Sequence, residues 1–122
     1  MIKRFDRLDV TTTDAADAAA VYERNFGFKV RHASGSNDAI IAVGDAELRL
    51  RSGVAVADAI AASGEGLAAI WLEAEDVDQV ATALRSAGIA FSAPRIEEGR
   101  RVLGIDPKAT NMVPLFIFDR RV

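Results

Sequence analysis

The first half of this chain is repeated, loosely, in its second half. The segment DVTTTDAADAAAVYERNFGF starts at Asp9, and a comparable segment, WLEAEDVDQVATALRSAGIAF, starts at Trp71. Each has a short strand pattern, an acidic residue at a helix start (Asp14 and Asp76), an apolar helical stripe and a glycine that ends the helix. A repeat of this length is too long for a solenoid unit, and it predicts two copies of one supersecondary module with a cleft between them.

The hydrophobic periodicity predicts a β-α-β-β-β order in each half. The expected strands cover residues 4–11, 28–33, 37–43 and 46–51 in the first half and 67–74, 89–92, 101–105 and 113–119 in the second, with helices at 14–26 and 76–87. We expect the Ala-rich segment 54–62 to be a linker or short helix, and the charged stretch RIEEGRR from Arg95 to be a solvated loop. We expect Tyr22, Phe26 and Phe28 in the core. The sequence predicts one α+β domain, with module one at about 1–53, a linker at about 54–65 and module two at about 66–122.

Composition excludes several classes of protein. The 122 residues include no cysteine, so disulfides and thiolate metal sites are impossible. The net charge is −3, which gives no basic footprint for nucleic acid. No stretch is apolar enough to span a bilayer or to act as a signal peptide, so we expect a cytoplasmic protein without a membrane or nucleic-acid partner.

The expected strands present two different faces, because alternate side chains point to opposite sides of a strand. One face is aliphatic and should pack under the helices: Leu8, Val10, Leu48, Leu50, Ile70, Leu72, Leu115 and Ile117. The other face mixes charge with aromatic groups: Phe5, Arg7, Asp9, Glu47, Arg49, Arg51, Ala69, Trp71, Glu73, Phe116 and Phe118. That mixture suits neither a solvated surface nor a dry core, and it predicts a partly enclosed cavity.

Nearly the whole chain resembles the vicinal oxygen chelate superfamily, which includes glyoxalase I, methylmalonyl-CoA epimerase, extradiol dioxygenases and the bleomycin-resistance proteins. The resemblance lies in FDRLDVTTTDAADAAAVYERNFGF, GLAAIWLEAEDVDQVATALRSAGIAFSAPR and IDPKATNMVPLFIF, and the last stretch looks most like the epimerase and glyoxalase-like branch. It implies two βαβββ modules that form a curved mixed sheet around a shared cavity, often within a homodimer.

The resemblance also locates the metal site of the superfamily. Its enzymes hold a divalent metal with a His on the first strand, a Gln, Glu or His on the fourth, a His on the fifth and a Glu on the eighth. The matching positions here are Arg7, Arg49, Ala69 and Phe116. Arginine offers only donors, while alanine and phenylalanine offer no ligand atom. We therefore expect no metal and no cofactor at these positions.

Two arginines and three aromatic residues are the candidate ligand-binding groups. Arg7 and Arg49 are expected on neighbouring strands, where they either grip one carboxylate or phosphate or are neutralised by Asp9, Glu47 and Glu73. The aromatic side chains of Trp71, Phe116 and Phe118 either stack a planar ligand or fill the space of the lost metal site. The only histidine, His32, is expected to be an ordinary surface or hydrogen-bonded residue.

The leading hypothesis is a metal-independent protein of the glyoxalase and bleomycin-resistance type. It would bind an anionic or aromatic small molecule in the cavity between the modules, through Arg7, Asp9, Glu47, Arg49, Trp71, Glu73, Phe116 and Phe118. The alternative is a lyase, isomerase or dioxygenase type of enzyme that uses no metal or one held by non-standard ligands such as Asp9, Glu47, Glu73 and His32. A third possibility is a structural or regulatory dimer with a filled cavity. Catalytic residues cannot be assigned from the sequence.

Overall fold

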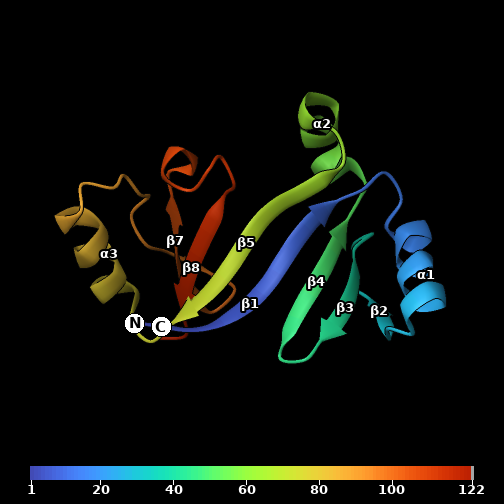
Figure 1. The fold of residues 1–122 in the computed structure, drawn as a ribbon, viewed down its shortest axis with the longest axis horizontal. Helices are drawn as coiled ribbons and strands as arrows, with labels where there is room; N and C mark the ends of the chain where they lie inside the picture. Colours follow the sequence, from blue (N-terminus) through green and yellow to red (C-terminus); the bar gives the residue numbers. More distant parts are fainter. Residues whose placement is uncertain (122) are drawn as a thin grey trace. The chain divides into compact units, whose positions relative to one another are not determined.

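The computed structural model describes residues 1–121 and contains the βαβββ order twice (Figure 1). The first copy consists of β1 (Ile2–Thr11), α1 (Ala15–Phe26), β2 (Val30–His32), β3 (Ala39–Val43) and β4 (Ala46–Arg51). The second consists of β5 (Gly66–Ala74), α3 (Val77–Ser86), β6 (Arg95–Glu97), β7 (Arg100–Ile105) and β8 (Leu115–Asp119), with a short 3-10 turn, η1 (Pro107–Ala109), before β8. This confirms the predicted α+β class and the two modules. The Ala-rich segment forms a helix, α2 (Val54–Ser63).

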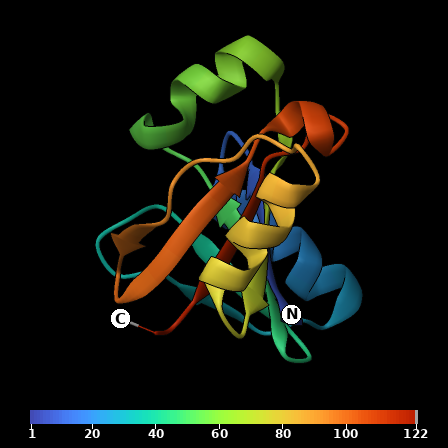
Figure 2. The same cartoon turned by 90° about the vertical axis from the view of Figure 1, so that its left-hand side faces the viewer.

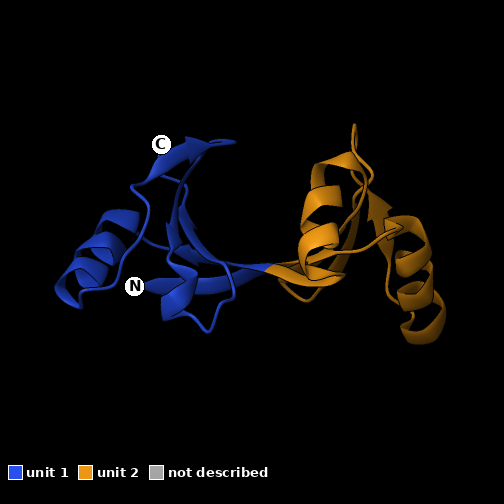
Figure 3. Cartoon of the chain, turned by 90° about the horizontal axis from the view of Figure 1, so that it is seen from above, with its two compact units in different colours: residues 1–6, 69–122 blue, residues 7–68 orange. Residues whose placement is uncertain are grey.

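The chain divides into two compact units that are coloured separately in Figure 3. Unit 1 consists of residues 1–6 and the residues from 69 onward, and unit 2 consists of residues 7–68. In unit 2 the strand order is β2-β3-β4-β1, and in unit 1 it is β5-β8-β7-β6. In each unit the first strand of the repeat lies parallel to the last one, and the other neighbours are antiparallel.

Helix α1 packs its alanines on the sheet of unit 2. Asp14 caps the helix by accepting a hydrogen bond from the N–H of Asp17, and Gly27 ends it in the left-handed conformation with φ of 71°. The residues that face the sheet, chiefly Ala15 and Ala19, contact β3 and β4 residues such as Ile41 and Leu50. These small side chains allow the helix to approach the strands closely.

The prediction that Phe26 lies in the core was wrong. Phe26 continues the stripe of Ala15, Ala19 and Tyr22 at helical spacing, but it is the last residue of α1 and is 67% exposed. It still contacts the rings of Tyr22 and Phe28, whose centroids lie 6.2 and 6.1 Å from its own. Tyr22 and Phe28 are half-buried against the core, as expected.

Helix α3 covers the aliphatic face of unit 1 (Figure 2). The side chain of Asp76 accepts a hydrogen bond from the N–H of Asp78 and so caps the start of the helix. The apolar stripe predicted from the sequence is buried against β7 and β8, and its members are Val77, Val80, Ala81 and the half-buried Leu84. Across residues 1–121, no helix combines the length and the apolar character needed to cross a bilayer.

The predicted strand at residues 89–92 was wrong, and so was the predicted loop from Arg95. Phe91 makes only an isolated bridge to Ile105, whereas Arg95–Glu97 forms β6 and pairs with β7. The connecting residues Glu98 and Gly99 have φ values of 51° and 74°. Two consecutive left-handed residues match the turn that joins tight hairpins, although Glu is an unusual residue for its first position. The charged side chains of residues 95–101 therefore lie on a hairpin at the edge of the sheet of unit 1.

Candidate functional site

The predicted separation of the two sheet faces is confirmed within each unit. The aliphatic residues Val10, Leu48 and Leu50 pack with α1, and Leu72, Leu115 and Ile117 pack with α3. On the opposite face of unit 1, a separate buried cluster consists of Ala69, Trp71, Val102 and Phe118, with Phe116 packed against it. The charged and aromatic candidates therefore lie away from the helices, with Arg7, Asp9, Glu47 and Arg49 in unit 2 and Trp71, Glu73, Phe116 and Phe118 in unit 1.

The two candidate arginines of unit 2, Arg7 and Arg49, are each paired with a buried aspartate. Nε of Arg7 lies 3.0 Å from Oδ1 of Asp9, whose side chain is only 5% exposed. Nε of Arg49 donates to Oδ2 of Asp38 at 2.9 Å, and Nε of Arg51 lies 3.6 Å from the same oxygen. Arg7 thus pairs with Asp9, one of the expected internal counter-charges, whereas Arg49 pairs with Asp38, which was not among the expected acids.

Asp38 was missed by sequence reasoning. It belongs to the turn-forming stretch SGSND, and this composition concealed a residue that is only 6% exposed. Its position directly before β3 was the available signal. Because β3 pairs with β4, a residue at this end of β3 lies close to the arginines of β4.

The two glutamates among the candidates also have cationic partners. Glu47 accepts a hydrogen bond from Arg31 at 2.9 Å in an exposed pair. Glu73 is buried and accepts one from Nε of Arg4 at 2.9 Å, while Lys3 and Arg120 lie 3.7 and 3.5 Å from its other oxygen. These carboxylates are therefore engaged in ion pairs within their own units.

The aromatic residues of unit 1 form one stacked cluster. The ring centroids of Trp71 and Phe116 lie 4.6 Å apart with their planes at 22°, and Trp71 and Phe118 lie 6.4 Å apart in a tilted arrangement. The guanidinium carbon of Arg100 lies 4.7 Å from the centroid of Phe118 and 5.4 Å from that of Trp71. Arg100 was missed because the sequence places it in a mixed-charge stretch, yet only 9% of the residue is exposed.

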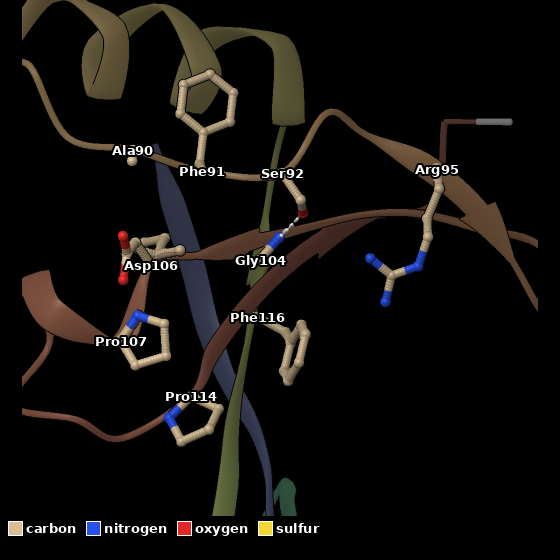
Figure 4. Close-up of a pocket in the computed structure, with 10 residues that line it drawn as sticks. Ala90, Phe91, Ser92, Arg95, Gly104, Asp106, Pro107, Pro114 and Phe116 are labelled. Atoms are coloured by element: carbon tan, nitrogen blue, oxygen red, sulfur yellow. Dashed lines mark hydrogen bonds between the residues drawn. The ribbon is translucent and has the colours of Figure 1, made fainter.

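Phe116 also lines a cavity of about 520 Å³ within unit 1, which Figure 4 shows in close-up. Its wall is largely apolar, and its polar members are Ser92, Arg95 and Asp106. The complete lining consists of Ala90, Phe91, Ser92, Arg95, Gly104, Ile105, Asp106, Pro107, Pro114 and Phe116. Of these residues, only Phe116 was among the predicted site residues.

Ser92 and Gly104 shape the floor of this cavity. The N–H of Gly104 donates to Oγ of Ser92 at 2.8 Å, and the N–H of Ser92 donates to the carbonyl of Gly104 at 2.8 Å (Figure 4). A Cβ atom at residue 104 would lie 3.2 Å from Cε1 of Phe116 and 3.4 Å from Oγ of Ser92. Glycine at this position therefore leaves room for the Phe116 ring.

An ionic network ties α3 to β7 and β8. Arg101 donates hydrogen bonds to Asp76, Asp78 and Asp119, and Asp119 also accepts one from the N–H of Val77 at 2.7 Å. Burial by itself would raise the pKa of the Asp119 carboxyl, but the hydrogen bonds from Arg101 and from two backbone N–H groups hold that pKa below its ordinary value. This network therefore depends on an ionised carboxylate.

The residues at the superfamily's metal positions do not fit a metal. Arg7 and Arg49 carry protonated guanidiniums that are already paired with aspartates. Ala69 and Phe116 belong to the apolar cluster around Trp71. Within residues 1–121 no group of three His, Asp or Glu side chains is arranged to hold a metal ion, and His32 is exposed on β2.

The chain belongs to the Glyoxalase/Bleomycin resistance protein/Dioxygenase superfamily, because the model of that family matches residues 4–106. This agrees with the vicinal oxygen chelate resemblance seen in the sequence. A search of curated proteins gave no match.

Solved structures of the same fold include two bacterial methylmalonyl-CoA epimerases. The enzyme from Mycobacterium tuberculosis has a TM-score of 0.79 at 20% identity, over 99% of this chain and 90% of that one. A variant of the Streptomyces coelicolor enzyme in complex with 2-nitronate-propionyl-CoA has a TM-score of 0.76 at 23% identity, over 100% of both chains. A hypothetical protein from Bacillus halodurans has a TM-score of 0.80 at 16% identity, over 98% of this chain and 95% of that one.

Proposed function

We propose that this chain is a small-molecule-binding member of the superfamily that works without the family's metal. Its ligand has an apolar or aromatic body and an anionic group. The observation that carries the proposal is the cavity of about 520 Å³ in unit 1, which combines an apolar wall with the guanidinium of Arg95. Its volume lies within the range of about 300–1,000 Å³ that is typical of small-molecule sites.

Three parts of the lining would contact different parts of the ligand: the apolar rings, the guanidinium of Arg95 and the hydroxyl of Ser92. The rings of Phe116, Pro107 and Pro114 offer flat apolar surface to the ligand body. Arg95 forms an exposed ion pair with Glu97 at 3.0 Å. Because an exposed pair contributes little to stability, the guanidinium can exchange Glu97 for a carboxylate of the ligand at small cost.

The hydroxyl of Ser92 supplies a second polar contact. Its oxygen already accepts the N–H of Gly104, so its own proton remains to be donated. A ligand oxygen at the floor of the cavity would accept that proton. The site would thus hold the anionic part of the ligand with a charged donor and a neutral one.

The solved relatives support an anionic small molecule as the ligand class. The variant of the Streptomyces coelicolor enzyme is in complex with 2-nitronate-propionyl-CoA. Another structure of a methylmalonyl-CoA epimerase is in complex with methylmalonyl-CoA and NH4+. Both of these organic ligands join an acyl group to an anionic carrier, and the cavity proposed here has a comparable division between apolar and cationic surfaces.

The second candidate is an epimerase-like enzyme of the isomerase or lyase class. The likeness of the whole chain to methylmalonyl-CoA epimerases favours it. The chemistry of the four matched positions counts against its metal-dependent form, because none of these side chains provides a ligand lone pair. Binding without turnover is therefore the preferred function.

We also propose that the chain acts as a homodimer. The support is family resemblance together with the apolar surface of α2, whose first residue, Val54, is 94% exposed while only Val56 is buried. A second copy would remove this surface from water. Light scattering at micromolar concentration should give twice the mass of one chain, and a monomeric mass would contradict this part of the proposal.

Titration followed by fluorescence tests the proposed site. Trp71 is the only tryptophan and stacks on Phe116, so a ligand beside Phe116 should change its emission. Benzoate, benzyl alcohol and benzylamine have the same ring and differ in charge. We expect benzoate to bind best and benzylamine worst. Stronger binding of benzylamine, or no saturable change with any of the three, would overturn the proposal.

A pair of matched variants tests the role of Arg95. Arg95→Ala should weaken benzoate binding roughly tenfold, because one charge-assisted hydrogen bond is lost, and should leave benzyl alcohol binding unchanged. Arg31→Ala is the control, since Arg31 also lies on a three-residue edge strand and pairs with a glutamate at 2.9 Å. Elemental analysis after dialysis completes the test. About one divalent metal per chain would favour the epimerase-like enzyme over the metal-independent binding protein.

A further inference from the structure

We infer that Arg100 is an oxyanion-binding residue that recognises a carboxylate or phosphate group beside the ring cluster of Trp71 and Phe118. The inference goes beyond the proposed function, because Arg100 is not among the residues that line the cavity. It rests on the burial of most of the Arg100 side chain and on the chemistry of the groups around it.

The side chain of Arg100 is mostly buried, and its guanidinium has no hydrogen-bonding partner among residues 1–121. Its side chain is 11% exposed, and the nearest carboxylate oxygen in this part of the chain, Oε2 of Glu98, lies 3.6 Å from Nη2. That distance exceeds a hydrogen bond, and the Glu98 side chain is 81% exposed. Arginine remains protonated in proteins, and a buried charge without hydrogen bonds is unfavourable.

The aromatic rings stabilise the charge of Arg100 and leave its donors available. Its guanidinium carbon lies 4.7 Å from the Phe118 centroid and 5.4 Å from the Trp71 centroid, within the range of cation–π interaction. A ring face attracts the positive charge but does not replace the in-plane acceptors that the N–H groups require. The fork of N–H donors matches the two oxygens of a carboxylate or phosphate.

Three other arginines of unit 1, Arg4, Arg101 and Arg120, differ from Arg100 in having a close carboxylate. Arg101 donates to three aspartates, and Arg4 donates to both Glu73 and Asp6. Arg120 lies 5.6 Å from the Phe118 centroid and 3.5 Å from a Glu73 oxygen, so it adds positive charge near Arg100 while having its own counter-ion. Arg100 and Arg120 thus both lie over the Phe118 ring, and Arg100 is the one whose nearest carboxylate is beyond hydrogen-bond distance.

Glu98 is positioned to compete for this group. It occupies the tight turn of the β6–β7 hairpin with φ of 51°, and its carboxylate is the nearest anion to Arg100 within the described part of the chain. An exposed carboxylate at 3.6 Å contributes little as a permanent partner. Removing its charge should therefore make Arg100 more receptive to an external anion.

The test uses the full chain and the emission of Trp71, whose ring lies against Arg100. Sodium phosphate and sodium acetate are each titrated at constant ionic strength against sodium chloride, which lacks the paired oxygens. We expect a saturable change with at least one oxyanion and none with chloride. Arg100→Lys should weaken that binding roughly tenfold, because an ammonium cannot reproduce the fork. Glu98→Gln should strengthen it, and Arg31→Lys should leave it unchanged.

Two outcomes would overturn the inference: the same response to chloride as to both oxyanions, or equal oxyanion affinity in wild type and Arg100→Lys. If Arg100→Lys does not fold, the Nε–H resonance of Arg100 is followed by NMR in the wild-type chain. A bound oxyanion must shift this resonance saturably, and an unchanged resonance would overturn the inference. A response to phosphate identifies a free-phosphate site, whereas a response to acetate alone identifies a carboxylate site. Failure with both oxyanions, combined with Arg95-dependent benzoate binding, would reject this inference and leave the proposed function standing.

Discussion

The indole of Trp71 stacks on the phenyl ring of Phe116, with centroids 4.6 Å apart. The sequence resemblance places Phe116 at the position where the metal-binding enzymes of the superfamily carry a glutamate, and here that position makes an aromatic contact. The same ring lines the cavity of unit 1. This one residue therefore belongs both to the matched metal position and to the proposed ligand site.

Replacing Phe116 with alanine should destabilise the chain by about 2–3 kcal/mol, because both ring stacking and apolar burial are lost. Urea unfolding followed by circular dichroism measures the change. Phe26→Ala is the control, since Phe26 is 67% exposed. The control should change the free energy of unfolding by less than about 1 kcal/mol. Equal effects of the two substitutions would contradict a structural role for the Trp71–Phe116 stack.

Gly104→Ala should displace the Phe116 ring, because the added Cβ would lie 3.2 Å from its Cε1 atom. We expect a loss of about 1–2 kcal/mol in unfolding free energy and weaker benzoate binding. In the double variant Gly104→Ala/Phe116→Leu, the shorter side chain removes the contact, so the two effects should not add. Strict additivity in this cycle would show that residues 104 and 116 do not interact.

Asp38 and Arg49 should be strongly coupled, because the Asp38 side chain is only 8% exposed and accepts the Arg49 Nε–H at 2.9 Å. A double-mutant cycle with Asp38→Ala and Arg49→Ala should give a coupling energy of about 1–3 kcal/mol. The exposed Arg31–Glu47 pair is the matched control, for which we expect less than about 0.5 kcal/mol. A coupling no larger than that of the control would mean that Arg49 is available for a ligand.

Acid should weaken the contact of α3 with β7 and β8 through Asp119. The folded pKa of this carboxyl lies below its unfolded value, so its contribution is present above about pH 4, the ordinary pKa of Asp, and is lost as the pH falls through the folded pKa. In Asp119→Asn, unfolding free energy should fall at neutral pH and depend less on pH between about 2 and 4. Asp58→Asn, on the exposed face of α2, is the control and should follow the wild-type profile.

Local chemistry explains why much of the fold was predictable. Asp14 and Asp76 are helix caps followed by apolar stripes, and both helices start at the residue after the cap. The alternation of residues on the first and last strand of each module identified which face packs under a helix. Helix caps and apolar stripes depend on residues within one or two helical turns, and strand faces depend on the alternation of side chains. A single sequence is therefore enough to recognise them.

The parts that were missed depend on contacts between strands. Arg95 and Arg100 belong to a hairpin whose turn begins with Glu98, and neither composition nor periodicity distinguishes this hairpin from a solvated loop. Asp38 becomes important only because strand pairing brings it next to Arg49. The cavity is lined by residues from several segments of unit 1, so its lining follows from the packing of that unit rather than from a motif.

The local pairing at the replaced metal positions also limits how this lineage can evolve. Changing Arg7 to histidine would remove the guanidinium beside the buried carboxylate of Asp9, and changing Arg49 would do the same to Asp38. Each change would lower stability before any other metal ligand was in place. Stepwise substitution toward a metal site therefore passes through less stable variants. We expect related chains that keep Asp9 and Asp38 to keep Arg7 and Arg49 as well, so that each arginine changes together with its own aspartate.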